Sequence, residues 1–503
     1  MQNASTSTPN AARQPHIKAN KLCSSLSLLS NRKSSNGKSL RTMEVKKITL
    51  NNIGLFSKLD IALSPAADSP GNITVFIGNN GAGKTSILKS LATSLSWLTA
   101  RLRSEKGSGN PIPEYVISNS EGSASIELEL IGPSPRRESG NEDTSSHTFT
   151  WTLARSKKGR KSLFSTNLQD CNKLSGHYRE VLASDPNSSL PLIAFYPVER
   201  VVLDIPLKIK TKHSFLQLDG YDNSLNQGVD FRRFFEWFRE REDTENESGI
   251  PDEVIQQLSV LIESSRQDIW QRLNEIRATA KDRQLTAVRT AIKRFMPHMD
   301  NLRVRRKPRL YMAIDKDGHT LNVAQLSQGE KSLISLVGDI ARRLAMLNPS
   351  LENPLDGDGI VMIDEVDLHL HPSWQRSLCK RLTETFPKCQ FILTTHSPLV
   401  ISDTKDILVY TLEMGDIQRL PSQYGQDANS VLLDAMDTSA RNEDVQKMLN
   451  DLLDHIDANN SAKANCLLEE LIKEISADNI ELVKAKLLLR KQELRNEKNH
   501  KNS

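Results

Sequence analysis

A phosphate-loop pattern constrains the fold of this chain more than any other feature. The pattern G-x-x-x-x-G-K-[ST] occupies residues 78–85 within NITVFIGNNGAGKTSILKSLATSLSWL. A short β-branched run, 73–77, precedes the loop, and an apolar stretch with helical periodicity follows it. Strand, glycine loop and helix in this order favour a nucleotide-binding α/β unit over a structural glycine loop, because backbone N–H groups of such loops cradle phosphates.

The residue types in this loop suit a triphosphate and a magnesium ion. The ammonium group of Lys84 is placed to reach the β- and γ-phosphate oxygens, and the hydroxyl of Thr85 is a hard oxygen ligand for Mg²⁺. The predicted nucleotide contacts are Gly78, Asn79, Asn80, Gly81, Ala82, Gly83, Lys84, Thr85 and Ser86.

A second helix start, in LSQGEKSLISLVGDI at 326–340, has two interpretations. Ser327 and Glu330 have the spacing of a capping box, in which each side chain pairs with the backbone N–H of the other. A helix N-terminus also offers unpaired N–H groups and partial positive charge to a phosphate, and Gly329 would let that phosphate approach closely. The local sequence alone favours a capping box without a phosphate. The choice between the two interpretations therefore depends on motifs elsewhere in the chain.

Candidate catalytic groups follow two buried strands. Asp364 and Glu365 end the apolar run 360–363, and His396 follows the strand in QFILTTHSP. In an open α/β sheet, ligands collect at the carboxyl ends of the strands. Asp364 is therefore predicted to orient the Mg²⁺ shell, Glu365 to position or activate the attacking water, and His396 to sense the γ-phosphate.

Composition narrows the class of protein. The formal net charge is only +4, so no global basic field points to nucleic acid or to an anionic membrane. The five cysteines contain no C-x-x-C pair, which argues against a zinc site or a disulfide framework and fits a reducing cytoplasm. No apolar run approaches the roughly 20 residues that span a bilayer, and no signal peptide is recognisable. We expect a cytoplasmic protein that is neither secreted nor embedded in a membrane.

The chain is expected to divide into five parts. These are a disordered tail (1–42), an N-terminal lobe with the phosphate loop (43–200), a helical insertion (201–300), a C-terminal lobe (301–425) and a C-terminal helical extension (426–503). The insertion carries a phenylalanine stripe at helical spacing, which is typical of a core or an interface. The extension breaks at 458–460 and at 477–478, which predicts three short helices suited either to packing or to partner docking.

A local basic ribbon offers a possible contact with nucleic acid. Arg303, Arg305, Lys307 and Arg309 alternate along NLRVRRKPRLYM and are expected on one strand face. Such a face either follows a phosphate backbone or is simply solvated, and the sequence leaves both interpretations open.

Taken in order, these motifs resemble the ABC-type ATPase heads of the RecF and structural-maintenance-of-chromosomes group. GNNGAGKT is similar to Walker A, LSQGEKS to the signature motif, IVMIDE to Walker B, residues 366–371 to the D-loop and His396 to the switch histidine. The resemblance implies an α/β P-loop NTPase head that hydrolyses ATP with Mg²⁺. It also implies that Ser327, Gly329 and Glu330 of one head face the γ-phosphate of a second head in a homodimer or higher oligomer. No residue can be assigned to the Q-loop.

The chain further resembles the compact PtuA-type ATPases of Septu antiphage systems, which also accompany some retrons. FFEWFRERED, DEVDLHLHPSWQ and YGQDANSVLLDAMDTS carry this resemblance. It implies an ATPase that regulates an HNH nuclease and, in a retron, works beside a reverse transcriptase and its DNA. The alternative is a RecF-like repair ATPase that acts on DNA directly; a transporter engine is disfavoured, because nothing in the sequence docks to a membrane domain.

Overall fold

The computed structural model describes residues 43–66, 69–134, 146–199, 201–202, 215–226, 228–248, 281–434, 436, 442–476 and 479–501. Among the sequence predictions, the disordered tail at 1–42 lies outside these residues, and so do the segments 203–214 and 249–280 of the predicted helical insertion.

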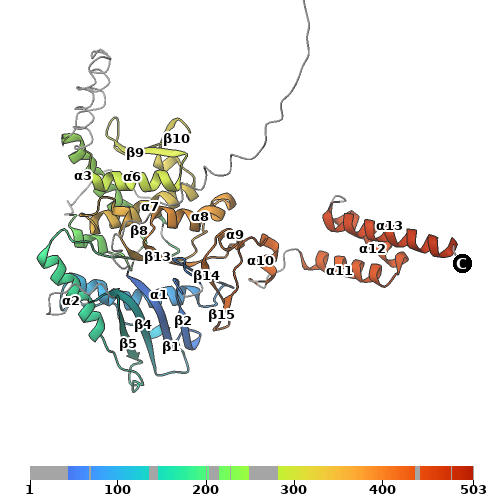
Figure 1. Cartoon of the computed structure of the whole chain (residues 1–503), viewed down its shortest axis with the longest axis horizontal. Coiled ribbons are helices and arrows are strands. Elements are labelled where there is room, and N and C mark those ends of the chain that lie inside the picture. The colour runs from blue at the N-terminus through green and yellow to red at the C-terminus, as the bar shows by residue number, and fades with distance from the viewer. Residues whose placement is uncertain are drawn as a thin grey trace, which may run out of the picture. The chain divides into compact units, whose positions relative to one another are not determined.

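A six-stranded sheet forms the centre of the head (Figure 1). Its order is β15 (Asp416–Leu420), β14 (Ile407–Glu413), β3 (Ile73–Gly78), β13 (Cys389–Thr394), β12 (Gly359–Ile363) and β6 (Leu192–Tyr196). All pairs are parallel except β14 with β15, so five strands end at the same edge. Strands β12, β13 and β6 are buried along their whole length, which explains why β12 and β6 are continuous apolar runs and why the two polar residues of β13, Gln390 and Thr394, are hydrogen-bonded.

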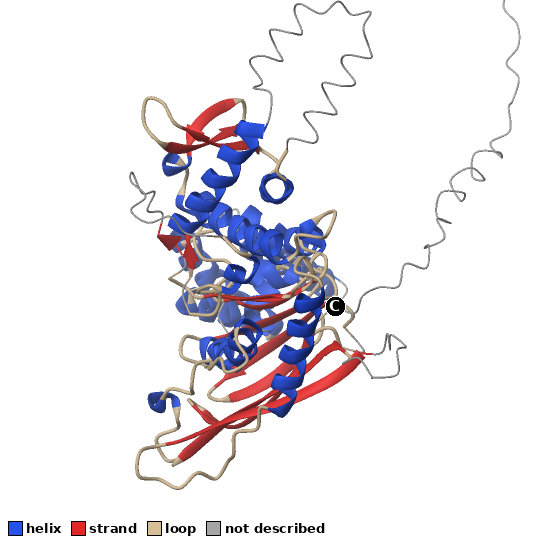
Figure 2. Cartoon of the chain, turned by 90° about the vertical axis from the view of Figure 1, so that its left-hand side faces the viewer, coloured by secondary structure: helices blue, strands red, loops and turns tan. Residues whose placement is uncertain are grey.

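A four-stranded antiparallel sheet forms a second layer. It contains β2 (Phe56–Ala62), β1 (Glu44–Ile53), β4 (Ser123–Pro133) and β5 (Ser146–Ser156) in that order. Helix α1 (Lys84–Arg103) contacts strands of both sheets and lies between them (Figure 2). Helix α2 (Gln169–Ser184) packs on α1 and β5. Helix α2 is an element of this lobe that was not predicted from the sequence.

Helices and short strands from the predicted insertion, the C-terminal lobe and the start of the extension pack on the other side of the central sheet. They are β7 (Val201–Val202), β8 (Val229–Asp230), α3 (Phe231–Ser248), α6 (Arg283–Phe295), α7 (Gln328–Leu347), α8 (Pro372–Thr385), α9 (Pro398–Ser402) and α10 (Ala428–Asp434). A small sheet contains β9 (Met299–Arg305), β10 (Tyr311–Lys316) and β11 (His319–Asn322). Helices α6 and α7 lie between this small sheet and the four-stranded antiparallel sheet (Figures 1 and 2). The predicted phenylalanine stripe on α3 is fully buried and belongs to the core: Phe231, Phe234, Phe235 and Phe238.

Short 3₁₀ turns complete the head. They span Glu114–Val116 (η1), Gln217–Tyr221 (η2), Val323–Gln325 (η3) and Pro354–Asp356 (η4).

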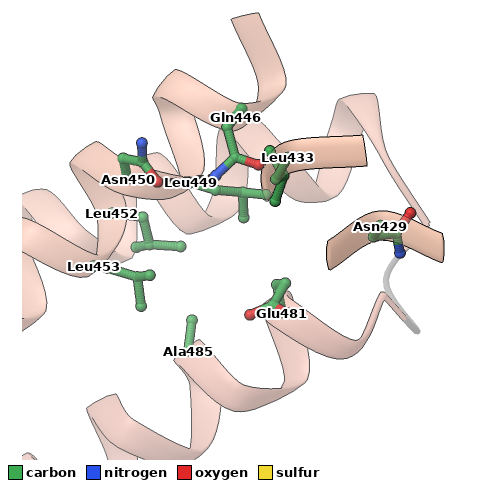
Figure 3. Close-up of a pocket in the computed structure, with 9 residues that line it drawn as sticks. All are labelled: Asn429, Leu433, Gln446, Leu449, Asn450, Leu452, Leu453, Glu481 and Ala485. Carbon is green, nitrogen blue, oxygen red and sulfur yellow. Dashed lines mark hydrogen bonds between the residues drawn. The ribbon is translucent and has the colours of Figure 1, made fainter. Parts of the chain in front are cut away.

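Three helices at the C-terminus have an apolar core of their own. These are α11 (Glu443–Asp457), α12 (Ser461–Glu474) and α13 (Ile480–Lys501). Leu452 of α11 faces Ala485 of α13 (Figure 3), and Leu471 of α12 belongs to the same buried cluster. The predicted break at 458–460 is confirmed, whereas the predicted break at 477–478 lies outside the described residues. None of the helices in the described ranges is long and apolar enough to cross a membrane.

The side chain of Gln390 joins the two sheets of the head through hydrogen bonds. It is buried on β13, donates to the backbone oxygens of Val45 (2.8 Å) and Ser64 (2.6 Å), and accepts from the Val45 N–H (2.9 Å). Gln390→Leu leaves these backbone groups unpaired, so we expect the free energy of unfolding to fall by about 2–5 kcal/mol in denaturant titrations. Gln418→Leu, the same change at an exposed position of β15, should cost less than about 0.5 kcal/mol. Equal losses would contradict this role.

Candidate ATP site

The phosphate loop leaves β3 at the carboxyl edge of the central sheet. Gly83 has a φ of 104°, and a Cβ at this position would lie 2.4 Å from the Phe56 ring, so glycine is required there. Lys84 begins α1, and its Nζ donates to the carbonyl oxygens of Gly78 (2.7 Å) and Asn79 (3.0 Å). The lysine therefore spans the loop in which a phosphate chain would lie.

The charge of Lys84 is held in a buried position beside carboxylates. Its side chain is only 6% exposed, and this burial lowers its pKa, while the carboxylates of Asp364, Glu365 and Asp367 oppose the shift. Residues 79–81 next to it are exposed, whereas Ala82 is buried, so the loop is open to solvent on one side. A buried ammonium beneath an open loop of glycines is suited to an anionic polyphosphate.

Two oxygen ligands from distant parts of the chain meet beside the loop. The Thr85 hydroxyl donates to Asp364 Oδ2 at 2.8 Å, and the Thr394 hydroxyl donates to Oδ1 of the same carboxylate at 2.6 Å. Hydroxyl and carboxylate oxygens are the ligands that Mg²⁺ prefers, so Thr85 and Asp364 fit the predicted metal site. A magnesium ion, when bound, neutralises charge on the β- and γ-phosphates; Thr394 fixes the orientation of Asp364.

Glu365, which is predicted to position or activate the attacking water, comes directly after Asp364 in the chain. Glu365 has a left-handed backbone conformation (φ 46°), and its N–H donates to the Thr394 hydroxyl at 2.7 Å. A non-glycine residue in this region costs about 1 kcal/mol or more, and such strain is typical of functional sites. His396 is exposed two residues beyond β13, and the preceding Thr395 donates to Asp367. The same sheet edge therefore carries the phosphate loop, both Walker B acids and His396.

The signature turn forms the predicted capping box. Ser327 is the N-cap of α7, its Oγ accepts from the Glu330 N–H (3.4 Å), and its own N–H donates to Glu330 Oε2 (2.9 Å). Lys316 of β10 also pairs with Glu330 at 2.7 Å. Burial opposes ionisation of Glu330, but the bonds from Lys316 and Ser327 outweigh it and lower the pKa. A Cβ on Gly329 would lie 2.4 Å from the His369 oxygen, so glycine lets the turn touch the D-loop backbone.

Sequence reasoning missed two supporting residues. Thr394 had a signal, because it is a short polar residue at the end of an apolar strand whose neighbour His396 was recognised. Lys316 had no local signal. It ends β10, its partner Glu330 lies in the first turn of α7, and only the tertiary fold brings these two elements together.

The expectation of a single basic strand face was wrong. Arg303 is half-buried and paired through two hydrogen bonds with Asp315, each of 2.9 Å, which hold the pKa of that carboxyl at about 2. Arg305 ends β9, and Lys307 and Arg309 lie in the loop that follows. Pro308, which has no N–H for a ladder bond, lies with them in the turn that leads to β10. Arg305, Lys307 and Arg309 are nevertheless all exposed.

The parallel sheet, the glycine loop and the Thr85–Asp364 pair define a P-loop ATPase, which confirms the predicted fold class. A family profile described as "AAA domain, putative AbiEii toxin, Type IV TA system" matches residues 73–402, and an AAA ATPase domain profile matches residues 43–97. The retron Vc95 probable ATPase of Vibrio cholerae serotype O1 biovar El Tor is 34% identical over 72% of this chain and 73% of its own length. The chain therefore belongs to the ATPase family that the first profile describes, and the retron Vc95 probable ATPase is its relative.

Two further matches cover other parts of the expected resemblance. The Septu protein PtuA of Bacillus mycoides (strain KBAB4) is 40% identical over 113 residues, which are 21% of this chain and 15% of that protein. Among solved structures, the recombination mediator protein RecF with ATPrS aligns over 76% of this chain and 100% of that chain, at 15% identity and a TM-score of 0.36. The retron and Septu relatives confirm the predicted resemblance to PtuA-type ATPases of Septu and retron systems.

The site generates a prediction about nucleotide binding and turnover. Losing a charge-assisted contact costs roughly 1.5–3 kcal/mol, which is about ten- to a hundredfold in affinity or rate. Lys84→Ala should weaken ATP binding by about this factor, while Glu365→Gln should bind ATP normally and lose turnover, in fluorescent-nucleotide binding and phosphate-release assays. Lys380→Ala, an exposed lysine on α8, is the matched control for the first change. Undiminished turnover in Glu365→Gln would remove Glu365 from its role.

Proposed function

We propose that this chain is an ATP-driven switch in bacterial antiphage defence, in which two heads close on ATP and thereby control a partner nuclease in the cytoplasm. The observation that carries the proposal is that one head carries two turns whose backbone and charge suit a phosphate. One is the loop with its Thr85–Asp364 pair, and the other is the signature turn at the start of α7. The names of the retron ATPase and of the Septu protein PtuA support the defence context.

The signature turn is built to bind a phosphate and remain a stable cap. Ser327 uses its backbone N–H and hydroxyl to hold Glu330, and Lys316 ties the same carboxylate to β10. The turn is therefore rigid before any ligand arrives, and the positive end of α7 stays available for an anion. The capping box and the phosphate site are compatible. In our proposal, Ser327 and Gly329 contact the γ-phosphate held by the second head.

Closure of two heads is tested by its dependence on Ser327. A Glu365→Gln chain should form more dimer with ATP than with ADP, as measured by light scattering, because slow turnover preserves the closed state. Adding Ser327→Arg should abolish that gain, since the long cation occupies the contact. Ser350→Arg adds the same side chain at an exposed site just beyond the other end of α7 and should leave the gain intact.

The same mass with ATP and ADP would contradict closure, provided that a distance probe between the heads also reports no nucleotide-dependent change. The probe is needed because a preformed dimer can close without a change in mass.

The partner in this proposal is an HNH nuclease, accompanied in a retron complex by a reverse transcriptase and its DNA. The ATPase positions or restrains this nuclease, since ATP moves an equilibrium only by binding one state more tightly. Among the described residues after His396, the acidic side chains of α11 are spread along the helix surface rather than gathered at one point. Asp451, Asp454 and Asp457 lie exposed on one helix, α11, and two-metal nucleases instead gather their carboxylates around two ions.

The chain alone is therefore expected to cut no nucleic acid. Purified protein with ATP and Mg²⁺ or Mn²⁺ should leave DNA and RNA intact on gels, and co-expression with the product of the neighbouring gene should produce cleavage. Robust cleavage by the chain alone, lost on substitution of its own carboxylates, would contradict the switch and indicate a self-contained nuclease.

The alternative function is a DNA-repair ATPase that acts on DNA directly. The observation in its favour is the exposed basic group Arg305, Lys307 and Arg309 at the end of β9. Duplex DNA binding by the purified chain, with a salt dependence that weakens when all three are changed to alanine, would favour this alternative.

A further inference from the structure

A buried ionic cluster sits in the middle of the signature helix. Asp339 of α7 accepts from Arg342 Nη2 at 2.6 Å and from Arg343 Nε at 2.7 Å, and its side chain is fully buried. The hydroxyl of Tyr196 donates to the same carboxylate at 3.0 Å. Burial opposes the ionised form of Asp339, but the two guanidinium groups outweigh it and hold its pKa well below the usual range.

Tyr196 connects this cluster to Asp364, the predicted Mg²⁺ ligand. It is the last residue of β6, which pairs with the Walker B strand β12. Its backbone oxygen accepts from the Asp364 N–H at 2.9 Å, while its hydroxyl reaches Asp339. One residue therefore bonds both to the predicted Mg²⁺ ligand and to the helix that begins with the signature turn.

The cluster also reaches the helix that follows the phosphate loop. Arg343 donates to the backbone oxygens of Gly220 (2.7 Å) and Asp222 (3.0 Å). The Asp222 carboxylate pairs with Arg103, the last residue of α1, and with Arg233 of α3. A continuous set of polar contacts thus joins α7 to both elements that carry the Walker motifs.

Such a cluster is better explained by orientation than by stability. Replacing buried ion pairs with well-packed apolar side chains is often neutral or stabilising, so their presence is weak evidence of a stabilising role. Their directional bonds instead define one relative placement of the elements that they join. Because α7 is a continuous helix from Gln328 to Leu347, fixing Asp339 also fixes the signature turn at its start.

We propose that Tyr196 is a positioning residue that, through Asp339, sets the signature helix in the orientation needed to close on the nucleotide of a second head. This inference rests on the proposed closure of two heads. It predicts that removing the Tyr196 hydroxyl impairs closure and leaves nucleotide binding to a single head unchanged, because the phosphate loop does not use this hydroxyl.

The test compares two tyrosine variants of the full chain in the Glu365→Gln background. Tyr196→Phe removes the bond to Asp339, and Tyr221→Phe removes an equally buried hydroxyl that donates to the Pro191 oxygen at 2.7 Å. A fluorescent ATP analogue should bind the parent and both variants with affinities within about twofold. The concentration needed for the ATP-dependent dimer should rise about tenfold in Tyr196→Phe, as expected for a lost bond to a charged group, and stay unchanged in Tyr221→Phe.

Each other result has a defined meaning. A dimer that forms equally well in Tyr196→Phe and in the parent would overturn the positioning role and leave head closure standing. Equal weakening in both variants would also overturn it, because the effect would then be general destabilisation, which thermal unfolding of the two variants would reveal. No ATP-dependent association in the parent chain, by mass or by distance probe, would instead refute the proposed function itself.

Discussion

The hydrogen bond between the Thr85 hydroxyl and the Asp364 carboxylate is the contact around which the head is organised. It joins residues that are 279 positions apart, and it requires that β3 and β12 end at the same edge of the sheet. The strand between them, β13, supplies Thr394, which completes the contact from the other side of the carboxylate. Parallel order in the sheet is therefore what converts two separate motifs into one site.

Much of this arrangement follows from local sequence, because the relevant signals are local. The phosphate loop needs glycine at Gly83, and the capping box at Ser327 and Glu330 is a pattern of three-residue spacing, so both were predicted and found. The buried strand before Asp364 was also predicted from local sequence, because its apolar run is too short for a buried helix.

The contacts that tune the site could not be predicted in the same way. The pairing of Lys316 with Glu330 and the bond from Tyr196 to Asp339 connect elements whose neighbourhood is set only by the tertiary fold. The basic strand face was mispredicted for a related reason. Alternation along the sequence assumed one strand, whereas Arg303 pairs with Asp315 and the strand ends at Arg305, before Lys307 and Arg309. Periodicity identifies elements well and identifies partners poorly.

In the proposed mechanism, the ATP site is shared between two heads. The most direct measurement is a structure of the Glu365→Gln chain with ATP and Mg²⁺. It should contain two heads, with Ser327 of one within about 3 Å of the γ-phosphate that Lys84 of the other holds, which is hydrogen-bond distance. A nucleotide bound by Lys84 and Thr85 whose γ-phosphate contacts no second head would contradict this mechanism.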